Sequence, residues 1–171
     1  EYQVLNSKDF GVPQNRERVF IVGHLGGKPG RKVFPITRSS GQALTELTQG
    51  LADAYRVYDP AGVARTLKAE AGGVGAKTGL YAVPVLTPDR AEKRQNGRRF
   101  KEPGEPMFTV PMTIEGVRIR RLTPLECFRL QGFPDEHFHN AKAAGVSDDQ
   151  LYRQAGNAVT VNVVYEIAKR L

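Results

Sequence analysis

A short apolar run near the start of the chain sets the first constraint on the fold. Residues 19–22 read Val-Phe-Ile-Val and follow a turn that contains Gly11 and Pro13. A continuous apolar run of this length is typical of a strand buried on both faces. Such a strand needs neighbours, yet few other segments of the 171 residues show the same pattern. Because the chain also opens without a methionine, we expect it to be part of something longer.

Residues 28–120 have a different character, because Gly, Pro and polar residues dominate them. Short bursts of β-type residues occur at 79–86, 106–112 and 116–120. This pattern predicts an irregular β-rich lobe with long loops, which in compact proteins are usually functional or disordered. The segment 87–105 is the most basic piece, and we expect it to be the most mobile.

Helical signals return at Thr123. Thr123 as N-cap, Pro124 at the first helical position and Glu126 three residues after the cap predict a capping box. Gly132 and Pro134 then end this helix within about two turns, because Gly favours the C-terminal cap and Pro cannot continue a helix.

Two further helices are predicted toward the end of the chain. The sequence Ser-Asp-Asp-Gln at 147–150 is a typical helix start. The last helix is expected to begin at the Gly156-Asn157 pair, because apolar residues then repeat with helical spacing. These residues are Ala158, Val161, Val164, Ile167, Ala168 and Leu171. We therefore divide the chain into residues 1–27, a lobe of residues 28–120, and residues 121–171.

The charge of the chain bounds its partners. The net charge is +7 and the pI is about 9.7, which favours a polyanion such as DNA because Lys and Arg displace counterions from phosphates. Solubility alone is the other interpretation of this charge. No apolar run approaches the length of a membrane span, and nothing resembles a signal peptide, so we expect no membrane contact and a cytoplasmic location.

The single cysteine, Cys127, raises the question of nucleophilic chemistry. It lies inside the predicted helix after Thr123, with no neighbouring histidine to hold it as a thiolate. Free cysteine is also among the most frequently buried residue types. We therefore interpret Cys127 as a structural residue. One cysteine and three histidines also predict no disulfide within the chain and no metal site.

Four stretches, read in order, resemble the C-terminal part of DNA cytosine-5 methyltransferases. They are GVPQNRERVFIVG (11–23), ARTLKAEAGGVGAKTGLY (64–81), RRLTPLECFRLQGFPD (120–135) and QLYRQAGNAVTVNVV (150–164). The resemblance implies an α/β fold: the last strands and helices of a Rossmann-like methyltransferase domain that uses S-adenosylmethionine, plus a small β-rich target-recognition lobe. It also implies base flipping in double-stranded DNA, in the setting of restriction–modification systems or their orphan relatives.

The resemblance further implies that parts of the enzyme lie outside this chain. The family's catalytic cysteine follows a proline in an early loop, a Glu-Asn-Val segment supplies an acidic residue, and a Gly-rich loop makes most cofactor contacts. None of these motifs occurs here. We therefore expect the chain to be inactive alone, and to work with the N-terminal catalytic part of the same enzyme or with a separate catalytic subunit.

Two arginines carry the expected catalytic support. Arg16 and Arg18 precede the apolar run and alternate with other residues, so on a strand they would share one face. By resemblance, Arg18 would contact cytosine O2 and the catalytic loop, and Arg16 a DNA phosphate near the flipped base. Gln14 would help to shape this loop at the DNA. Two solvated charges at a strand edge are the alternative.

The Gly-Asn motif carries the expected cofactor contacts. Asn157 is predicted to begin a helix, where free backbone N–H groups favour polar or anionic ligand groups. By resemblance, Asn157 and the backbone of Ala158 would lie near the methionine end of S-adenosylmethionine. A plain Asn helix cap is the simpler interpretation, and both can hold together.

The expected DNA contacts lie mostly in residues 64–81. By resemblance, Thr66 and Leu67 would anchor the recognition loop, and Lys68 and Glu70 would approach base edges, which suits a site containing G·C pairs. Gly72 and Gly73 would allow close backbone approach. A Gly-rich surface hairpin is the alternative for these residues.

Phosphate contacts are expected elsewhere in the lobe. Arg98 and Arg99 fit phosphates better than base edges. The segment 107–116 departs from the family pattern and has no assigned role. A non-enzymatic DNA-binding module and a degenerate remnant remain the competing interpretations of the whole chain.

Overall fold

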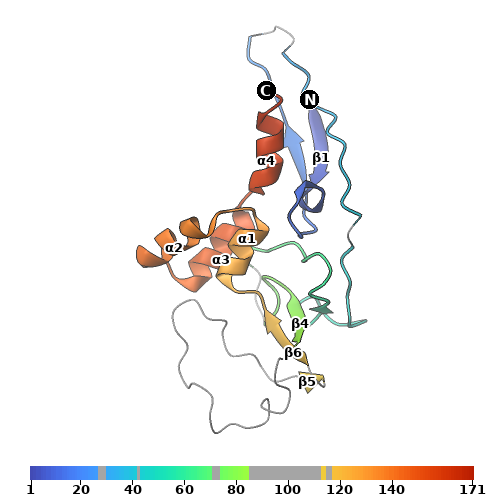
Figure 1. Ribbon diagram of the computed structural model, residues 1–171, viewed down its shortest axis with the longest axis vertical. Coiled ribbons are helices and arrows are strands. Elements are labelled where there is room, and N and C mark those ends of the chain that lie inside the picture. The colour runs from blue at the N-terminus through green and yellow to red at the C-terminus, as the bar shows by residue number, and fades with distance from the viewer. Residues whose placement is uncertain (27–29, 42, 71–73, 85–112, 115–116) are drawn as a thin grey trace.

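The computed structural model describes residues 1–26, 30–41, 43–70, 74–84, 113–114 and 117–171. Within these ranges, a two-stranded ribbon with the last helix occupies one end of an elongated molecule, and a four-stranded sheet lies toward the other (Figure 1). Three further helices lie between these two parts. The fold is therefore mixed α/β, as the sequence predicted.

The ribbon consists of β1 (Tyr2–Asn6) and β2 (Glu17–Ile21), which pair antiparallel. A 3₁₀ helix, η1 (Ser7–Phe10), follows β1 directly. Its N-cap residue Asn6 accepts a hydrogen bond from the backbone N–H of Lys8, which fixes the change of direction after the strand.

One face of the ribbon is covered and the other is not. On the covered side, residues of the ribbon, of the segment 33–36 and of the last helix form a hydrophobic cluster: Leu5, Phe10, Val33, Phe34, Ile36, Val163 and Ile167, with Phe20 and Val22 against it. The opposite face consists of Tyr2, Val4, Val19 and Ile21, each more than half exposed. The strand at 19–22, whose apolar run is typical of burial on both faces, is therefore covered on one face only in this chain, because only one layer packs on the ribbon.

The β-rich lobe is built on a four-stranded sheet with the order β3-β4-β6-β5. Its strands are β3 (Val57–Tyr58), β4 (Leu80–Pro84), β5 (Thr113–Ile114) and β6 (Val117–Arg121). β3 pairs parallel with β4, and the other pairs are antiparallel. The apolar bursts predicted at 79–86 and 116–120 coincide with β4 and β6. The burst at 106–112 and the basic segment 87–105 lie outside the described residues.

Helices follow the lobe: α1 (Pro124–Leu130), α2 (Asp135–Ala143), α3 (Asp148–Asn157) and α4 (Val161–Ala168). The capping box of α1 is present with both of its hydrogen bonds, between Thr123 and Glu126. This helix ends before Gly132, whose φ of +79° is in the left-handed region that favours glycine. Both predictions for α1 are confirmed.

The start of the last helix differs from the prediction. Gly156 and Asn157 are the final residues of α3, and α4 begins at Val161 after the N-cap residue Thr160. The backbone N–H of Ala158 donates to the carbonyl of Gln154, so α3 continues through the pair that was expected to start α4. Helical spacing alone could not separate these two helices, because Ala158 and Val159 between them are apolar too.

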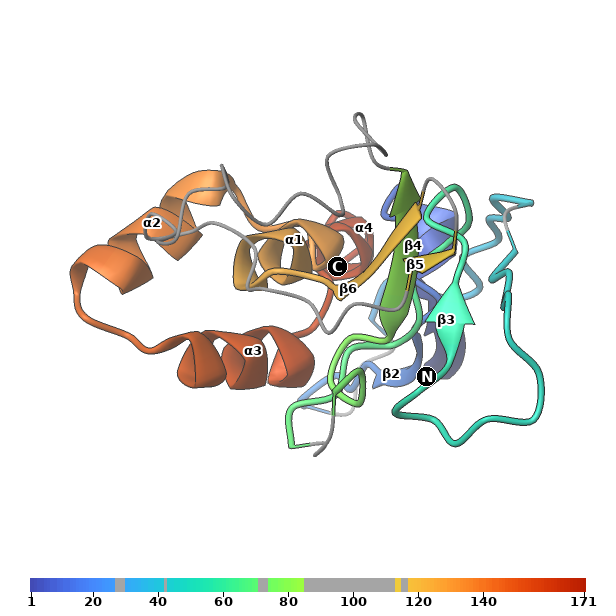
Figure 2. The same cartoon turned by 90° about the horizontal axis from the view of Figure 1, so that it is seen from below.

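Packing joins α1, α2 and α3 to the lobe, whereas α4 joins the ribbon (Figure 1). Figure 2 shows α1, α2 and α3 together on one side of the four-stranded sheet. One cluster combines lobe residues with residues of the three helices: Tyr58, Ala64, Leu67, Tyr81, Cys127, Phe128, Leu130, Phe138, Leu151, Tyr152 and Ala155. The division of the chain at residues 27 and 120 stays a prediction. The chain passes from the ribbon unit to the lobe unit after residues 33–36 and returns to the ribbon unit at the turn between α3 and α4.

Candidate functional site

Arg16 lies where these two units meet. Its side chain is only 4% exposed, and its guanidinium donates to three backbone carbonyls. Nη1 lies 3.1 Å from the oxygen of Leu67, and Nη2 lies 2.9 Å from the oxygens of both Gly156 and Ala158. Arg16, the residue directly before β2, therefore joins this strand to Leu67 of the segment 64–81 and to Gly156 and Ala158 at the end of α3. We call these four residues the Arg16 junction.

Electrostatics explain how a guanidinium is accommodated in this buried position. Burial, and to a smaller extent the charge of Arg18, lowers the pKa of Arg16 to about 10, so it stays protonated at neutral pH. None of the described carboxylates forms an ion pair with it. Instead, two of its acceptors lie at the C-terminal end of α3, where the helix dipole favours a cation.

Arg18 lies in a different environment from Arg16. Arg16 precedes β2, whereas Arg18 is within it and is exposed, donating to the carbonyl of Glu17. The expectation that both guanidiniums face one open site is therefore wrong in this structure. The expected phosphate contact of Arg16 stays a prediction, and in this structure its buried guanidinium donates to protein carbonyls.

The segment 64–81 lies directly beside the residues that precede Arg16. The backbone N–H of Ala64 donates to Pro13 over 2.7 Å, and the N–H of Asn15 donates to Ala64 over 2.8 Å. The hydroxyl of Thr66 donates to the carbonyl of Asn15, and Leu67 is buried in the lobe's main cluster. The two segments, far apart in sequence, are thus hydrogen-bonded together. Whether Thr66 and Leu67 contact DNA stays a prediction.

Gly156 allows this segment to approach α3. A Cβ atom at position 156 would lie 2.5 Å from the backbone nitrogen of Ala69 and 2.7 Å from the carbonyl carbon of Lys68. Real Cβ atoms do not approach backbone so closely. The glycine of the Gly-Asn pair is therefore required by backbone contact with the segment 64–81.

Gln14 is buried among these segments, with 0% of its surface exposed. Its backbone pairs with Ala64 in an isolated parallel bridge. Its side-chain amide nitrogen and oxygen have no hydrogen-bond partner within the described part of the chain. Buried amides are usually hydrogen-bonded, so the side chain of Gln14 is an exception among the described residues.

Asn157 and Ala158, the expected cofactor residues, are adjacent to the Arg16 junction. Asn157 is exposed, and none of the described residues hydrogen-bonds to its side-chain amide. Since it ends α3, the expected argument from free N–H groups at a helix start does not apply. The N–H of Ala158 is already donated to Gln154 and its carbonyl accepts from Arg16. The side chain of Asn157 is therefore the better candidate for a ligand contact.

The expected base-reading residues are exposed and paired with neighbours. Lys68 Nζ lies 2.6 Å from Asp53 Oδ2, and Glu70 lies 3.9 Å from Arg153. Hydrogen bonds from Lys68 and then Arg65 lower the pKa of Asp53 to about 2. Sequence reasoning missed Asp53, because the two partners that lower its pKa, Lys68 and Arg65, lie more than ten positions away. Gly72, Gly73, Arg98 and Arg99 lie outside the described residues.

Cys127 is a structural residue, as predicted. It is 1% exposed within the cluster that joins α1 to the lobe. Burial, followed by the charge of Glu126, raises the pKa of its thiol well above the usual range. A thiol that stays protonated at neutral pH is a poor nucleophile.

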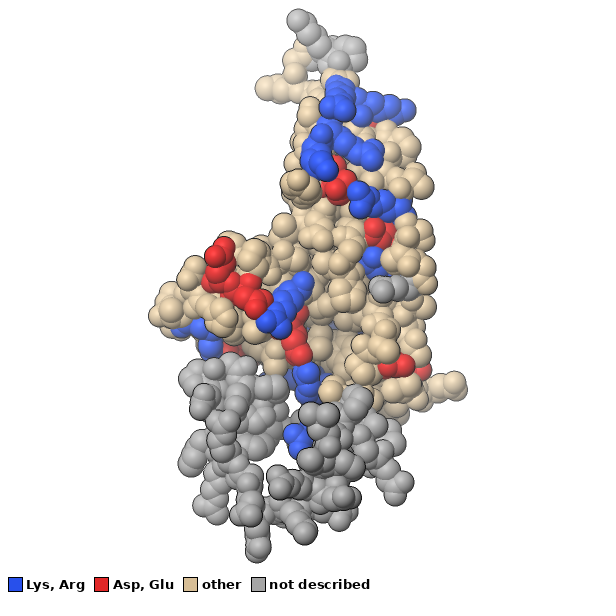
Figure 3. Space-filling view, viewed as in Figure 1, with Lys and Arg blue, Asp and Glu red and all other residues tan. Residues whose placement is uncertain are grey.

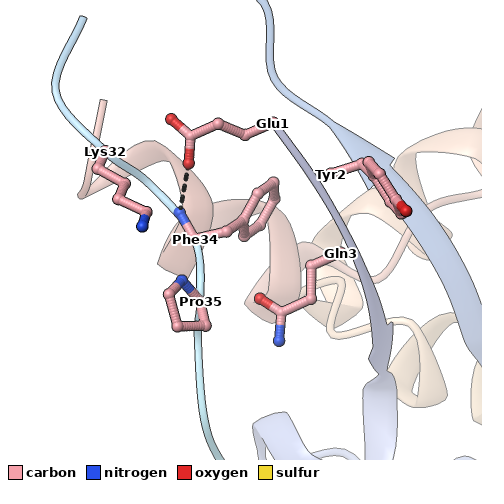
Figure 4. A pocket seen from close by; sticks show the side chains of 6 residues that line it. All are labelled: Glu1, Tyr2, Gln3, Lys32, Phe34 and Pro35. Atoms are coloured by element: carbon pink, nitrogen blue, oxygen red, sulfur yellow. Dashed lines mark hydrogen bonds between the residues drawn. The ribbon is translucent and has the colours of Figure 1, made fainter.

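The surface adds two observations. Figure 3 shows Lys and Arg on one face gathered mainly toward the end with the ribbon and α4, with Asp and Glu interspersed. A hollow lies between the start of β1 and residues 32–35, lined by Glu1, Tyr2, Gln3, Lys32, Phe34 and Pro35 (Figure 4). The carboxylate of Glu1, which lines this hollow, already accepts a hydrogen bond from the backbone N–H of Phe34 over 3.1 Å.

The described residues include neither a membrane-spanning helix nor a cluster of metal ligands. Every helix among them is too short or too polar to span a bilayer. No group of three or more His, Cys, Asp or Glu residues in those ranges could hold a metal ion.

Comparison with known proteins identifies the family. The model of the C-5 cytosine-specific DNA methylase family matches residues 1–55 and 36–171. The chain therefore belongs to the C-5 cytosine-specific DNA methylase family.

Its relatives are methyltransferases of phages and bacteria. The orphan methyltransferase M.SPBetaI of Bacillus phage SPbeta is 35% identical over 257 residues, covering 100% of this chain and 58% of the relative. The type II methyltransferase M.NlaX of Neisseria lactamica is 34% identical over 174 residues, covering 99% of this chain and 51% of the relative. The chain thus spans about half the length of these relatives.

A solved structure supports the fold. The Entamoeba histolytica methyltransferase EhMeth superposes with a TM-score of 0.55 at 15% identity, over 99% of this chain and 52% of that one. At this identity the likeness concerns the fold alone, and it agrees with the methyltransferase fold that the sequence predicted.

Proposed function

We propose that this chain is the C-terminal part of a DNA (cytosine-5-)-methyltransferase, which binds double-stranded DNA, selects the target sequence and completes the active site. The Arg16 junction is the observation that carries the proposal. One buried guanidinium binds the segment proposed to read DNA, through Leu67, and the turn proposed to border the cofactor, through Gly156 and Ala158. Target selection and methyl transfer need such a fixed spatial relationship.

The exposed side chains around the junction suit separate tasks in this reaction. The target base must leave the duplex before any group can reach it. Arg18, whose guanidinium is exposed, can then stabilise negative charge that develops on cytosine O2. Asn157 can hold a polar group of S-adenosylmethionine, which supplies an electrophilic methyl group. The thiolate that attacks the ring belongs to a segment outside this chain, since Cys127 is buried.

We further propose that the N-terminal catalytic part of the enzyme covers the open face of the ribbon. Tyr2, Val4, Val19 and Ile21 form this face. Val161, Val164 and Tyr165 of α4, which packs on the covered face through Val163 and Ile167, are also exposed on the same unit. Apolar patches of this kind mark interaction sites in soluble proteins. Because the chain spans about half the length of its relatives, the other half is the natural occupant.

Reconstitution tests the proposal. The chain is mixed with the catalytic part of the same enzyme, and transfer of a labelled methyl group from S-adenosylmethionine to DNA is measured. We expect no transfer by the chain alone and clear transfer by the pair. Ile21→Glu should prevent assembly of the pair without unfolding the chain, because Ile21 is 80% exposed here. The exposed Leu25→Glu, outside the ribbon strands, is the matched control.

Three outcomes would contradict it. Transfer by the chain alone that persists in Cys127→Ala would mean that the nucleophile was missed. A pair that assembles and binds DNA without transfer would favour the non-enzymatic binding module. Normal assembly of the Ile21→Glu variant would show that the ribbon face is not the contact surface.

A further inference from the structure

A buried hydrogen-bond network crosses the boundary between the two packing units. The hydroxyls of Ser7 and Thr160 lie 2.7 Å apart, and the Thr160 hydroxyl donates to Gln131 Oε1 over 2.9 Å. Gln131 Nε2 donates in turn to the carbonyl of Ala155 over 2.7 Å. All three side chains are buried, with exposures of 3%, 2% and 0% for Ser7, Thr160 and Gln131. We call this set the Gln131 network.

The carbonyl at its end fixes the direction of every hydrogen bond. The Ala155 carbonyl can only accept, so the nitrogen of the Gln131 amide must face it. The amide oxygen then faces Thr160 and requires the single hydroxyl proton of that residue. The Thr160 oxygen is left to accept from Ser7. The Gln131 amide and the Thr160 hydroxyl therefore have one arrangement, whereas the single proton of Ser7 has two acceptors within reach, Thr160 at 2.7 Å and the carbonyl of Arg16 at 3.3 Å.

The network and the Arg16 junction together hold one short turn. Gln131 binds the carbonyl of Ala155, and Arg16 binds the carbonyls of Gly156 and Ala158. The backbone N–H of Val161, just after the turn, donates to the Gln131 carbonyl over 2.8 Å. Backbone atoms on both sides of Asn157 are therefore fixed by other segments, while its own side chain is exposed.

The hydroxyl of Thr160 binds Gln131 instead of capping its own helix. Thr160 is the N-cap residue of α4, and a threonine there usually accepts a hydrogen bond from its own helix. In this structure its side chain makes no such cap bond. The hydroxyl instead connects Ser7 to Gln131, so its role lies in joining segments rather than in starting α4.

We propose that Gln131 and Thr160 are positioning residues that hold the turn 155–160 so that the Asn157 side chain is presented to the cofactor. The inference rests on the proposed function, in which Asn157 borders the S-adenosylmethionine pocket. A ligand group is most effective when the residues behind it prevent it from moving. Asn157 ends α3 with its side chain exposed, and the buried hydrogen bonds to the carbonyls around it hold the backbone from which this side chain projects.

A pair of substitutions at position 160 isolates the hydroxyl. Thr160→Val keeps the shape and removes the hydroxyl, whereas Thr160→Ser keeps the hydroxyl and removes a methyl group. Both are made in the complete enzyme formed by this chain and its catalytic part. Binding of S-adenosylhomocysteine is measured by calorimetry without DNA, DNA affinity is measured separately, and hydrogen exchange follows the Val161 amide.

We expect Thr160→Val to weaken S-adenosylhomocysteine binding by about tenfold, the scale of losing a residue that orients a ligand group. Exchange at Val161 should accelerate, and DNA affinity should stay unchanged. Thr160→Ser should behave like the wild type. Equal cofactor binding by the Val and Ser variants would overturn the inference.

A double variant separates positioning from folding. Thr160→Val leaves the buried oxygen of Gln131 without its donor, which can itself destabilise the protein. Thr160→Val with Gln131→Met removes both polar partners and replaces them with apolar groups of similar size. Weak cofactor binding at an unchanged melting temperature supports the inference, and wild-type cofactor binding by this variant overturns it. The variants can differ in cofactor binding as expected while the wild-type pair transfers no methyl group. That result would contradict the proposed function and not the positioning role.

Discussion

The backbone of Ala69 packs directly on Gly156, at a distance that leaves no room for a side chain on α3. This contact brings the segment 64–81 against the Gly-Asn pair. It explains the glycine by packing, because Gly156 is within α3 and needs no left-handed conformation. The two segments are therefore expected to respond together to any change at this contact.

Gly156→Ala should destabilise the chain by about 1–3 kcal/mol, the usual cost of forcing an extra carbon into a packed site. Backbone must move to admit the methyl group, because the nearest atoms belong to the main chain. Urea unfolding measures the change. Gly23→Ala is the control, since a Cβ there meets nothing within 4 Å. Equal stability of the two variants would mean that the contact yields without cost.

Arg16→Ala should cost about 3 kcal/mol or more, because it removes hydrogen bonds from a charged donor and leaves buried carbonyls unpaired. Arg16→Lys should recover only part of this loss, since an ammonium cannot reproduce the planar geometry of three hydrogen bonds. Thermal unfolding provides the comparison. Arg129→Ala, which removes an exposed arginine, should change little. A small effect of Arg16→Ala would show that these carbonyls find other partners.

The stabilising effect of Asp53 should depend on pH. Hydrogen bonds from Lys68 and Arg65 lower its pKa from 3.8 to about 2 in the folded chain. A carboxyl whose pKa is lowered by folding stabilises the fold at pH values above its pKa in the unfolded chain. This contribution is lost as the pH falls from about 4 toward 2. Asp53→Asn should therefore be less stable than the wild type at pH 7, by about 0.5 kcal/mol because the pair is solvent-screened. Urea unfolding at several pH values should show the difference shrinking below pH 4; a constant difference would contradict the assignment.

Arg18→Ala should lower the rate of methyl transfer by the reconstituted enzyme by about 10²–10³-fold, the usual effect of losing a group that stabilises transition-state charge. DNA affinity should fall far less. Single-turnover rates and equilibrium DNA binding are compared in the same preparation, with Arg129→Ala as a control at another exposed arginine. A proportional fall in rate and affinity would identify Arg18 as a phosphate contact.

Lys68→Ala should reduce discrimination between the true site and single-base variants by about 1–3 kcal/mol, as expected for a lost base contact. Arg98→Ala should weaken binding to all sequences alike and lower the salt slope by about one unit. Competition binding over single-base variants at two salt concentrations measures both effects. If discrimination is lost in Arg98→Ala and kept in Lys68→Ala, the recognition loop has been assigned to the wrong segment.

Local sequence signals predicted the parts of the fold that depend on near neighbours. The capping box of α1 needs only Thr123 and Glu126, three residues apart, and both hydrogen bonds are present. The burial of Cys127 follows from apolar neighbours on the same helix. The family resemblance, too, depended on short stretches in a fixed order, and the family comparison bears it out.

Tertiary structure decided what depends on distant partners. The sequence predicted that Arg16 shares one face with Arg18 at the DNA, but its acceptors on Gly156 and Ala158 lie 140 and 142 positions away. The end of α3 at Asn157 depended on the same long-range contacts, which hydrophobic spacing does not encode. The ribbon strand looked buried on both faces because Val19 and Ile21 are apolar, yet this chain supplies a layer for only one face. A sequence specifies which surfaces are apolar or charged, but burial and pairing also require the partner that the folded chain brings to them.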